Sequence, residues 1–188
     1  MPLYGLAFAV GNLCGPLLLG PLFDSVGRKP MISGTYIISG VLLAISGWMF
    51  DQGELTATTQ TFCWIVIFFF ASAGASAAYL TVSETWPIEI RAEAIAVFFA
   101  IAQLFGALGP AFYGWLIGDG SSRTGLFIGY LVGAGIMILG GVVEIVFGIN
   151  AEGKSLEAVT RPLTAIDEPA VEAQPELTPI ERLFQNKR

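Results

Sequence analysis

Two short segments of the sequence place acidic and basic side chains near one another within an otherwise apolar stretch. Residues 20–30 read GPLFDSVGRKP, with Asp24 four residues before Arg28, and residues 83–94 read SETWPIEIRAEA. A carboxylate and a guanidinium near a membrane surface can form a partly desolvated ion pair, which would stabilise one conformation of the protein. The alternative is that both segments are solvated loops. The candidate charge network comprises Asp24, Arg28, Lys29, Glu84, Glu89 and Arg91.

The residues around these charges predict how the backbone turns. Gly20 and Gly27 are the expected tight-turn positions, because glycine allows close helix contact and adopts positive φ readily. In the second segment, Pro87 is expected to end a helix, and Trp86 suits the membrane interface.

The composition excludes several classes of protein. Hydrophobic residues make up 54% of the 188 residues and charged residues only 13%, whereas soluble domains carry roughly a quarter charged residues. Histidine, the commonest general base and metal ligand, is absent. Cys14 and Cys63 both lie in apolar runs without metal-ligand spacing. We therefore expect no cofactor, no metal site and no enzyme, and the lack of a basic face argues against nucleic acid as a partner.

Apolar runs long enough to cross a bilayer separate the charged segments. A spanning helix needs about 20 mostly apolar residues, and five such runs lie at about residues 3–23, 31–50, 62–82, 94–117 and 125–149. Their short connections predict antiparallel neighbours. The expected fold class is an all-α, polytopic transmembrane helix bundle at residues 1–149.

The distribution of basic residues predicts the orientation of this bundle. Arg28, Lys29 and Arg91 lie in the first and third connections, whereas the second contains only Asp51 and Glu54. Positive residues concentrate on the cytoplasmic side, so we expect a multi-pass protein of the cell membrane with a cytoplasmic C-terminus. Residues 150–188 are rich in Pro, Glu and Ala, which predicts a mostly disordered cytoplasmic tail.

Polar residues inside the expected spans are candidates for contact with a transported solute, because they are costly to expose to lipid. Ser72, Ser76 and Tyr79 are spaced by four and three residues and so share one helix face. Asn12 and Gln103 lie in the first and fourth spans. Helix packing is the alternative role for all five residues.

Glu144 is the carboxylate within the last expected span. A carboxylate within the membrane is often a proton carrier. Glu144 is therefore a possible proton carrier, although it could equally reach the lipid headgroups.

Three motifs resemble those of the major facilitator superfamily. The first segment contains G-x-x-x-D-x-x-G-R-K, which is similar to the loop motif in the C-terminal half of that family. The second segment resembles the E-x-x-P-x-E-x-R loop of its sugar-porter and metabolite:proton symporter branch. Residues 152–157, EGKSLE, resemble the E-T-K-G-x-x-L-E-E sequence after the final helix of sugar porters. The three occur in the family's order.

This resemblance implies that the five spans match helices eight to twelve of a twelve-helix fold. It also implies a solute site between two six-helix halves, and alternating access by rocking. Asp24, Arg28, Glu84 and Arg91 would lock the cytoplasmic gate, with Lys29 and Glu89 as supporting charges. Residues 72–79 lack the proline of sugar porters, and the fourth span lacks their asparagine. These departures favour the metabolite:proton symporters.

The sequence thus predicts the C-terminal part of a secondary transporter for a small polar solute such as an organic acid, a sugar or phosphate, coupled to protons. Its expected partners are the solute, protons, the lipid bilayer and an N-terminal half in the same chain or in another. The alternative is a truncated, non-transporting membrane module that pairs with another half-transporter or is inactive.

Overall fold

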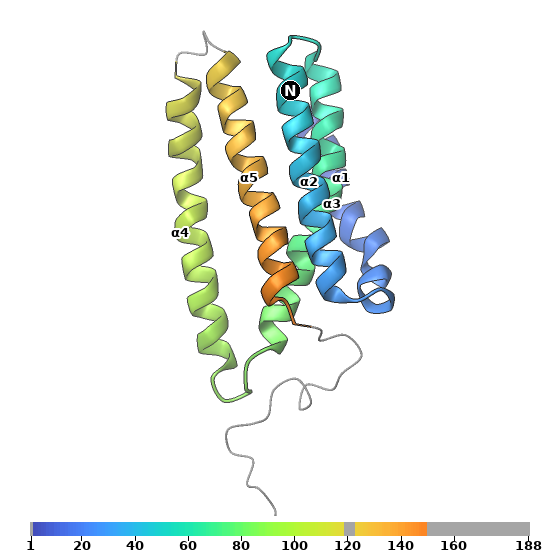
Figure 1. Cartoon of the computed structure of the whole chain (residues 1–188), viewed down its shortest axis with the longest axis vertical. Coiled ribbons are helices and arrows are strands. Elements are labelled where there is room, and N and C mark those ends of the chain that lie inside the picture. The colour runs from blue at the N-terminus through green and yellow to red at the C-terminus, as the bar shows by residue number, and fades with distance from the viewer. Residues whose placement is uncertain (1, 119–122, 150–188) are drawn as a thin grey trace, which may run out of the picture.

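The computed structural model describes residues 2–118 and 123–149 as a bundle of five helices (Figure 1). The helices are α1 (Pro2–Ser25), α2 (Arg28–Asp51), α3 (Ala57–Glu84), α4 (Arg91–Ile117) and α5 (Arg123–Phe147). All five are long and apolar enough to cross a membrane, with mean hydropathies of 1.5 to 2.3. The all-α transmembrane class expected from the sequence is confirmed. The predicted tail at residues 150–188 lies outside the described residues.

Most helices extend beyond the apolar runs that predicted them. The helix expected at residues 62–82 begins at Ala57, because Thr56 and Thr59 form a capping box at its start. The Thr59 N–H donates to Thr56 Oγ1 at 3.3 Å, and the Thr56 N–H donates to Thr59 Oγ1 at 2.8 Å. These bonds satisfy amide groups that would otherwise lack partners at a helix start. The last helix instead ends at Phe147, two residues before the expected boundary.

The helices pack unevenly. α2 packs along α5 and α3, and α1 packs along α3, whereas α4 makes few contacts with α5 and α3. Figure 1 shows α4 at the side of the bundle, next to α5. None of the α4 residues is buried within the described part of the chain. Lipid or further protein is therefore expected to cover most of the α4 surface.

Small residues allow a close contact between α2 and α5. A Cβ atom added at Gly40 would lie 2.9 Å from the Ala134 carbonyl oxygen, and one at Gly141 would lie 2.9 Å from the Ser33 carbonyl oxygen. Both positions therefore need glycine for the backbones to approach. Close packing through small residues is the usual means of helix association in membranes, where lipid removes much of the hydrophobic driving force.

Successive helices run in opposite directions, so the connections gather at two ends (Figure 1). At one end, here called the Arg28 end, α1, α3 and α5 finish and α2 and α4 begin. The opposite end, here called the Gly53 end, contains the connection from α2 to α3. Gly27 and Gly53 have φ angles of 114° and 77°, which favour glycine at these turns.

Candidate functional site

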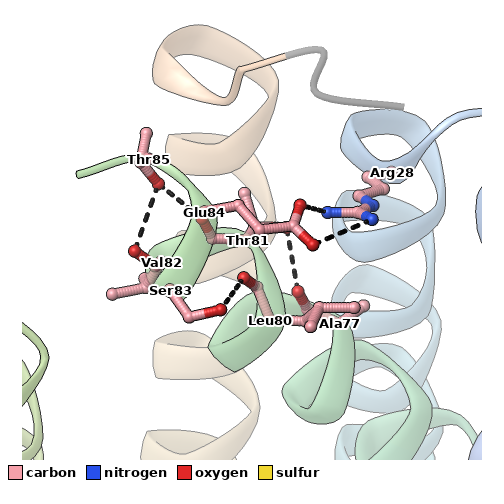
Figure 2. Close-up of polar contacts among 8 residues, drawn as sticks. All are labelled: Arg28, Ala77, Leu80, Thr81, Val82, Ser83, Glu84 and Thr85. Carbon is pink, nitrogen blue, oxygen red and sulfur yellow. Dashed lines mark hydrogen bonds and ion pairs between the residues drawn. The ribbon is translucent and has the colours of Figure 1, made fainter. Parts of the chain in front are cut away.

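An ion pair joins two helices at the Arg28 end. Arg28 Nη1 pairs with Glu84 Oε2, and Nη2 donates to Glu84 Oε1 at 3.4 Å (Figure 2). The two side chains are only 13% and 22% exposed. Two-pronged arginine–carboxylate contacts combine charge attraction with a fixed geometry. The contact therefore fixes the start of α2 against the end of α3, across 56 residues of sequence.

Local structure explains why these two side chains meet. Gly27 turns the chain after α1, so that Arg28 is the first residue of α2. Glu84 is the last residue of α3. Just before it in the same helix, Thr81 Oγ1 donates to the Ala77 carbonyl at 2.9 Å and Ser83 Oγ donates to the Leu80 carbonyl at 2.6 Å (Figure 2). These bonds satisfy the hydroxyl groups within their own helix and leave the carboxylate to reach α2.

A cavity of about 260 Å³ lies beside the ion pair, between α1 and α3. Its polar lining comes from Asp24, Arg28 and Ser76, and Gly20 and Ala73 also contact it. Asp24 is exposed, and it forms no ion pair with Arg28, although the structure describes both residues. An added Cβ at Gly20 would meet no atom within 4 Å. The cavity thus brings together four predicted site residues, Gly20, Asp24, Arg28 and Ser76, without a direct Asp24–Arg28 bond.

The remaining residues of the predicted charge network lie nearby. Arg91 Nε donates to the carbonyl oxygen of Trp86 at 3.1 Å, so this arginine braces the connection between α3 and α4. Glu89 is exposed in the same connection, and Lys29 is half-buried beside Arg28 at the start of α2.

Glu144 also belongs to the Arg28 end. It is half-buried and lies in the last turn of α5, three residues before the helix ends at Phe147. Lys29 and Tyr36 of α2 are close enough to interact with it electrostatically. The carboxylate therefore lies near a basic group.

The five predicted solute contacts do not meet at one site. Asn12 and Gln103 are exposed on α1 and α4, whereas Ser72 lies against Gly15 of α1. Ser76 lines the cavity beside Arg28, and Tyr79 stacks on Phe99 of α4 with ring centroids 4.8 Å apart.

The sequence interpretation missed a buried polar cluster near the Gly53 end. Gln60 Nε2 donates to Ser46 Oγ at 3.1 Å and to the Tyr130 hydroxyl at 2.7 Å, and Trp64 Nε1 donates to the same hydroxyl at 3.0 Å. Gln60 precedes the apolar run at residues 62–82, so the helix predicted from that run does not include it. The threonines at positions 56 and 59 were the available signal, because a capping box at this point places Gln60 in the first turn.

Within residues 2–118 and 123–149, no group of three or more His, Cys, Asp or Glu side chains could hold a metal ion. The charges at the Arg28 end are instead arranged in contacts between helices. Such contacts can control the conformation of a protein, and they supply no nucleophile or paired acid and base.

Five membrane-spanning helices with a charged, tightly connected end define a polytopic helical membrane protein. The family model of the Major Facilitator Superfamily matches residues 3–187. The chain belongs to this superfamily, whose members are membrane transporters rather than enzymes.

Two curated relatives are similar to the chain. The "Putative metabolite transport protein YaaU" of Escherichia coli (strain K12) is 26% identical over 139 residues, which cover 71% of this chain and 28% of that protein. The "Probable efflux pump mfs2" of Aspergillus flavus is 28% identical over 110 residues, covering 58% of this chain and 25% of that protein. The chain thus spans about a quarter of the length of these relatives. No solved structure matches it significantly.

Proposed function

We propose that these five helices are helices eight to twelve of a twelve-helix secondary transporter, with the Arg28 end and the C-terminal tail in the cytoplasm. This transporter moves a small polar metabolite, such as an organic acid, a sugar or phosphate, together with protons across the cell membrane by alternating access. The observation that carries the proposal is the ion pair between Arg28 and Glu84, which ties two helices at one end of the bundle.

The burial of this pair supports a role as a gate. Breaking a buried ion pair by removing one partner leaves an uncompensated charge and costs about 3 to 5 kcal/mol, and less where water reaches the group. At 13% and 22% exposure, the pair stabilises the arrangement in which α2 and α3 are close at the Arg28 end. An arrangement that opens this end has to break the pair or solvate it.

The arrangement of charges supports the proposed orientation. Arg28, Lys29 and Arg91 lie at the Arg28 end, whereas the described residues of the Gly53 end include Asp51, Glu54 and a single basic residue, Arg123. Membrane proteins retain basic residues in short connections on the cytoplasmic side.

The names of the two curated relatives support the proposed class of solute. One relative is named for metabolite transport, and the other for efflux. In this proposal, Asn12 and Gln103 face a cavity shared with the other half of the transporter, since a lipid-facing amide is costly. Glu144 exchanges the coupled proton, and Lys29 is the basic group close enough to interact with it.

A charge exchange in the intact transporter tests the gate. We expect Arg28→Glu and Glu84→Arg, each alone, to lower uptake at least tenfold, because like charges then face each other across α2 and α3. The double exchange restores part of the uptake, since opposite charges meet again. The measurement is uptake of radiolabelled organic acids, sugars and phosphate into vesicles with an imposed pH gradient.

Glu54→Arg is the matched control, because it reverses an exposed carboxylate at the Gly53 end. It should leave uptake near the wild-type rate. If both single exchanges transport normally, the gate assignment is wrong. If no solute tested enters wild-type vesicles in response to the pH gradient, the proposed solute and coupling are wrong.

The exposed amides of Asn12 and Gln103 also favour a second candidate, a non-transporting module that pairs with another half-transporter. An antibody raised against residues 168–177 distinguishes the two by immunoblotting of host membranes. A band at twice 20.0 kDa or more supports the transporter, and one at 20.0 kDa supports the module.

A further inference from the structure

Three buried polar residues near the Gly53 end, Ser46, Gln60 and Tyr130, and the partly exposed Trp64 are here called the Gln60 cluster. They join α2, α3 and α5, because Gln60 bonds to Ser46 of α2 and to Tyr130 of α5. Gln60 is 8% exposed and Tyr130 is 7% exposed. None of these four residues takes part in the proposed gate, which lies at the other end of the bundle.

Hydrogen bonding in the cluster is incomplete at one atom. Both protons of the Gln60 amide nitrogen are used, whereas the buried Gln60 Oε1 accepts no bond within the described part of the chain. The positions of the oxygen and the nitrogen in the Gln60 side-chain amide are assigned rather than observed. Exchanging the two would let Ser46 and Tyr130 donate to the oxygen, and would leave the NH₂ group without an acceptor. Either orientation leaves one buried polar atom unpaired, which is costly in an apolar interior.

Space for a small polar molecule lies next to the cluster. Trp64 and Tyr130 line a cavity of about 200 Å³ together with Leu43, Tyr113 and Leu126. A water molecule occupies about 30 Å³ of liquid, so the cavity is ample for one. The lining is apolar apart from the tyrosine and tryptophan polar atoms. A charged ligand would therefore have no counter-charge among these lining residues, whereas a neutral molecule with an O–H group fits.

We propose that the Gln60 cluster is a binding site for one buried water molecule, which completes the hydrogen bonds of the Gln60 amide. This water makes the polar contacts between α2, α3 and α5 complete, so the three helices are held together at the Gly53 end. The proposal is independent of the gate, because it concerns a different end and makes no reference to solute transport. A water-mediated bond is nearly as favourable as a direct one.

Radiolytic footprinting of the full chain in lipid nanodiscs tests for the water directly. Hydroxyl radicals generated from a bound water oxidise the side chains next to it, and mass spectrometry measures the rate at each residue. We expect Tyr130 to be oxidised several-fold faster than Tyr36, a tyrosine that is also largely enclosed by the bundle. Gln60→Met should remove this excess, because methionine offers the water no strong partner.

The thermal stability of the same variant gives a second, independent readout. If water completes the network, Gln60→Met breaks satisfied bonds and lowers the melting temperature by about 4 °C. If Gln60 Oε1 is unsatisfied, removing this buried unpaired group offsets the loss of the two direct bonds from Gln60 Nε2 to Ser46 and Tyr130, so the melting temperature should fall much less or not at all. Gln103→Met is the matched control, since Gln103 is exposed on α4, and it should change the melting temperature little.

Slow oxidation of Tyr130 in the wild-type chain overturns the proposal, even if Gln60→Met cannot be purified. Oxidation that persists in Gln60→Met, or a melting temperature that does not fall, also overturns it. Fast oxidation of Tyr130 that disappears in Gln60→Met, together with a lower melting temperature, is the result expected.

Discussion

At the scale of single residues, hydroxyl side chains make most of the polar contacts within these helices. Ser39, which is fully buried, donates to the Thr35 carbonyl at 2.7 Å, and Thr35 donates to the Met31 carbonyl at 2.8 Å. A hydroxyl that bonds to its own helix can be buried in an apolar bundle, and Ser39 Oγ also contacts the Ile67 carbonyl of α3 at 3.3 Å. This explains how α2 can present serine and threonine at its contacts with α3 and α5.

The capping box at the start of α3 gives a prediction at this scale. Thr56→Ala removes the side chain that accepts from the Thr59 N–H, which should lower the free energy of unfolding by about 1 kcal/mol. The amides of the first turn should exchange with solvent faster, as hydrogen-exchange mass spectrometry of residues 57–60 would measure. Thr58→Ala, a neighbouring exposed threonine, is the control. Equal exchange in both variants would contradict the capping role.

The sequence predicted some site residues and missed others, for physical reasons. Arg28 and Glu84 could be placed at one end because each adjoins a break between apolar runs. The sequence could not predict which of them form an ion pair, because several acidic and basic side chains lie at the same end of the bundle. Asp24 is an example: it lies near Arg28 in sequence and lines its cavity without pairing to it. Gln60 was missed because a polar residue at the start of a span resembles a loop residue.

At the scale of the helices, the contact between α2 and α5 depends on which α5 glycines face α2. Gly140 and Gly141 are adjacent, yet an added Cβ meets no atom within 4 Å at Gly140, whereas at Gly141 it would lie 2.7 Å from Ile37 Cγ1 and 2.9 Å from the Ser33 carbonyl. The number of glycines in the sequence could not reveal this difference, because it depends on how α5 is rotated about its axis.

This difference predicts opposite effects for two similar substitutions. Gly141→Ala should destabilise the bundle by about 1 to 3 kcal/mol, because the new methyl group would force α2 and α5 apart. Gly140→Ala should be neutral or stabilising by up to about 1 kcal/mol, since alanine favours helix more than glycine does. Melting temperatures in one detergent would measure both. Similar losses in the two variants would contradict the packing described for α5.

At the scale of the whole molecule, the number and order of the helices could be predicted from the sequence. Apolar runs of membrane-spanning length identified all five helices. Their packing could not be predicted in the same way. A run as apolar as residues 94–117 gives no indication that α4 would stand at the side of the bundle with none of its described residues buried.

The proposed orientation predicts which end of the bundle a membrane-impermeant maleimide reaches. In a background without Cys14 and Cys63, Glu54→Cys should react in intact cells, because it is exposed at the Gly53 end. Ser25→Cys, exposed at the Arg28 end, should react only after the cells are permeabilised. The reverse pattern would place the Arg28 end outside and would contradict the proposed orientation.

In the proposed opening of the Arg28 end, the short link between α1 and α2 limits which helices can separate. Two residues lie between Ser25 and Arg28, so the three chain steps reach about 10 Å when fully extended. The axes of packed helices are already about 8 to 10 Å apart. The extended link is therefore hardly longer than this distance, and the linked ends of α1 and α2 cannot separate much further. The six residues between Glu84 and Arg91 could stretch to about 24 Å. Arg28 therefore stays close to the end of α1, and Glu84 is the residue that moves away from Arg28 in the proposed opening.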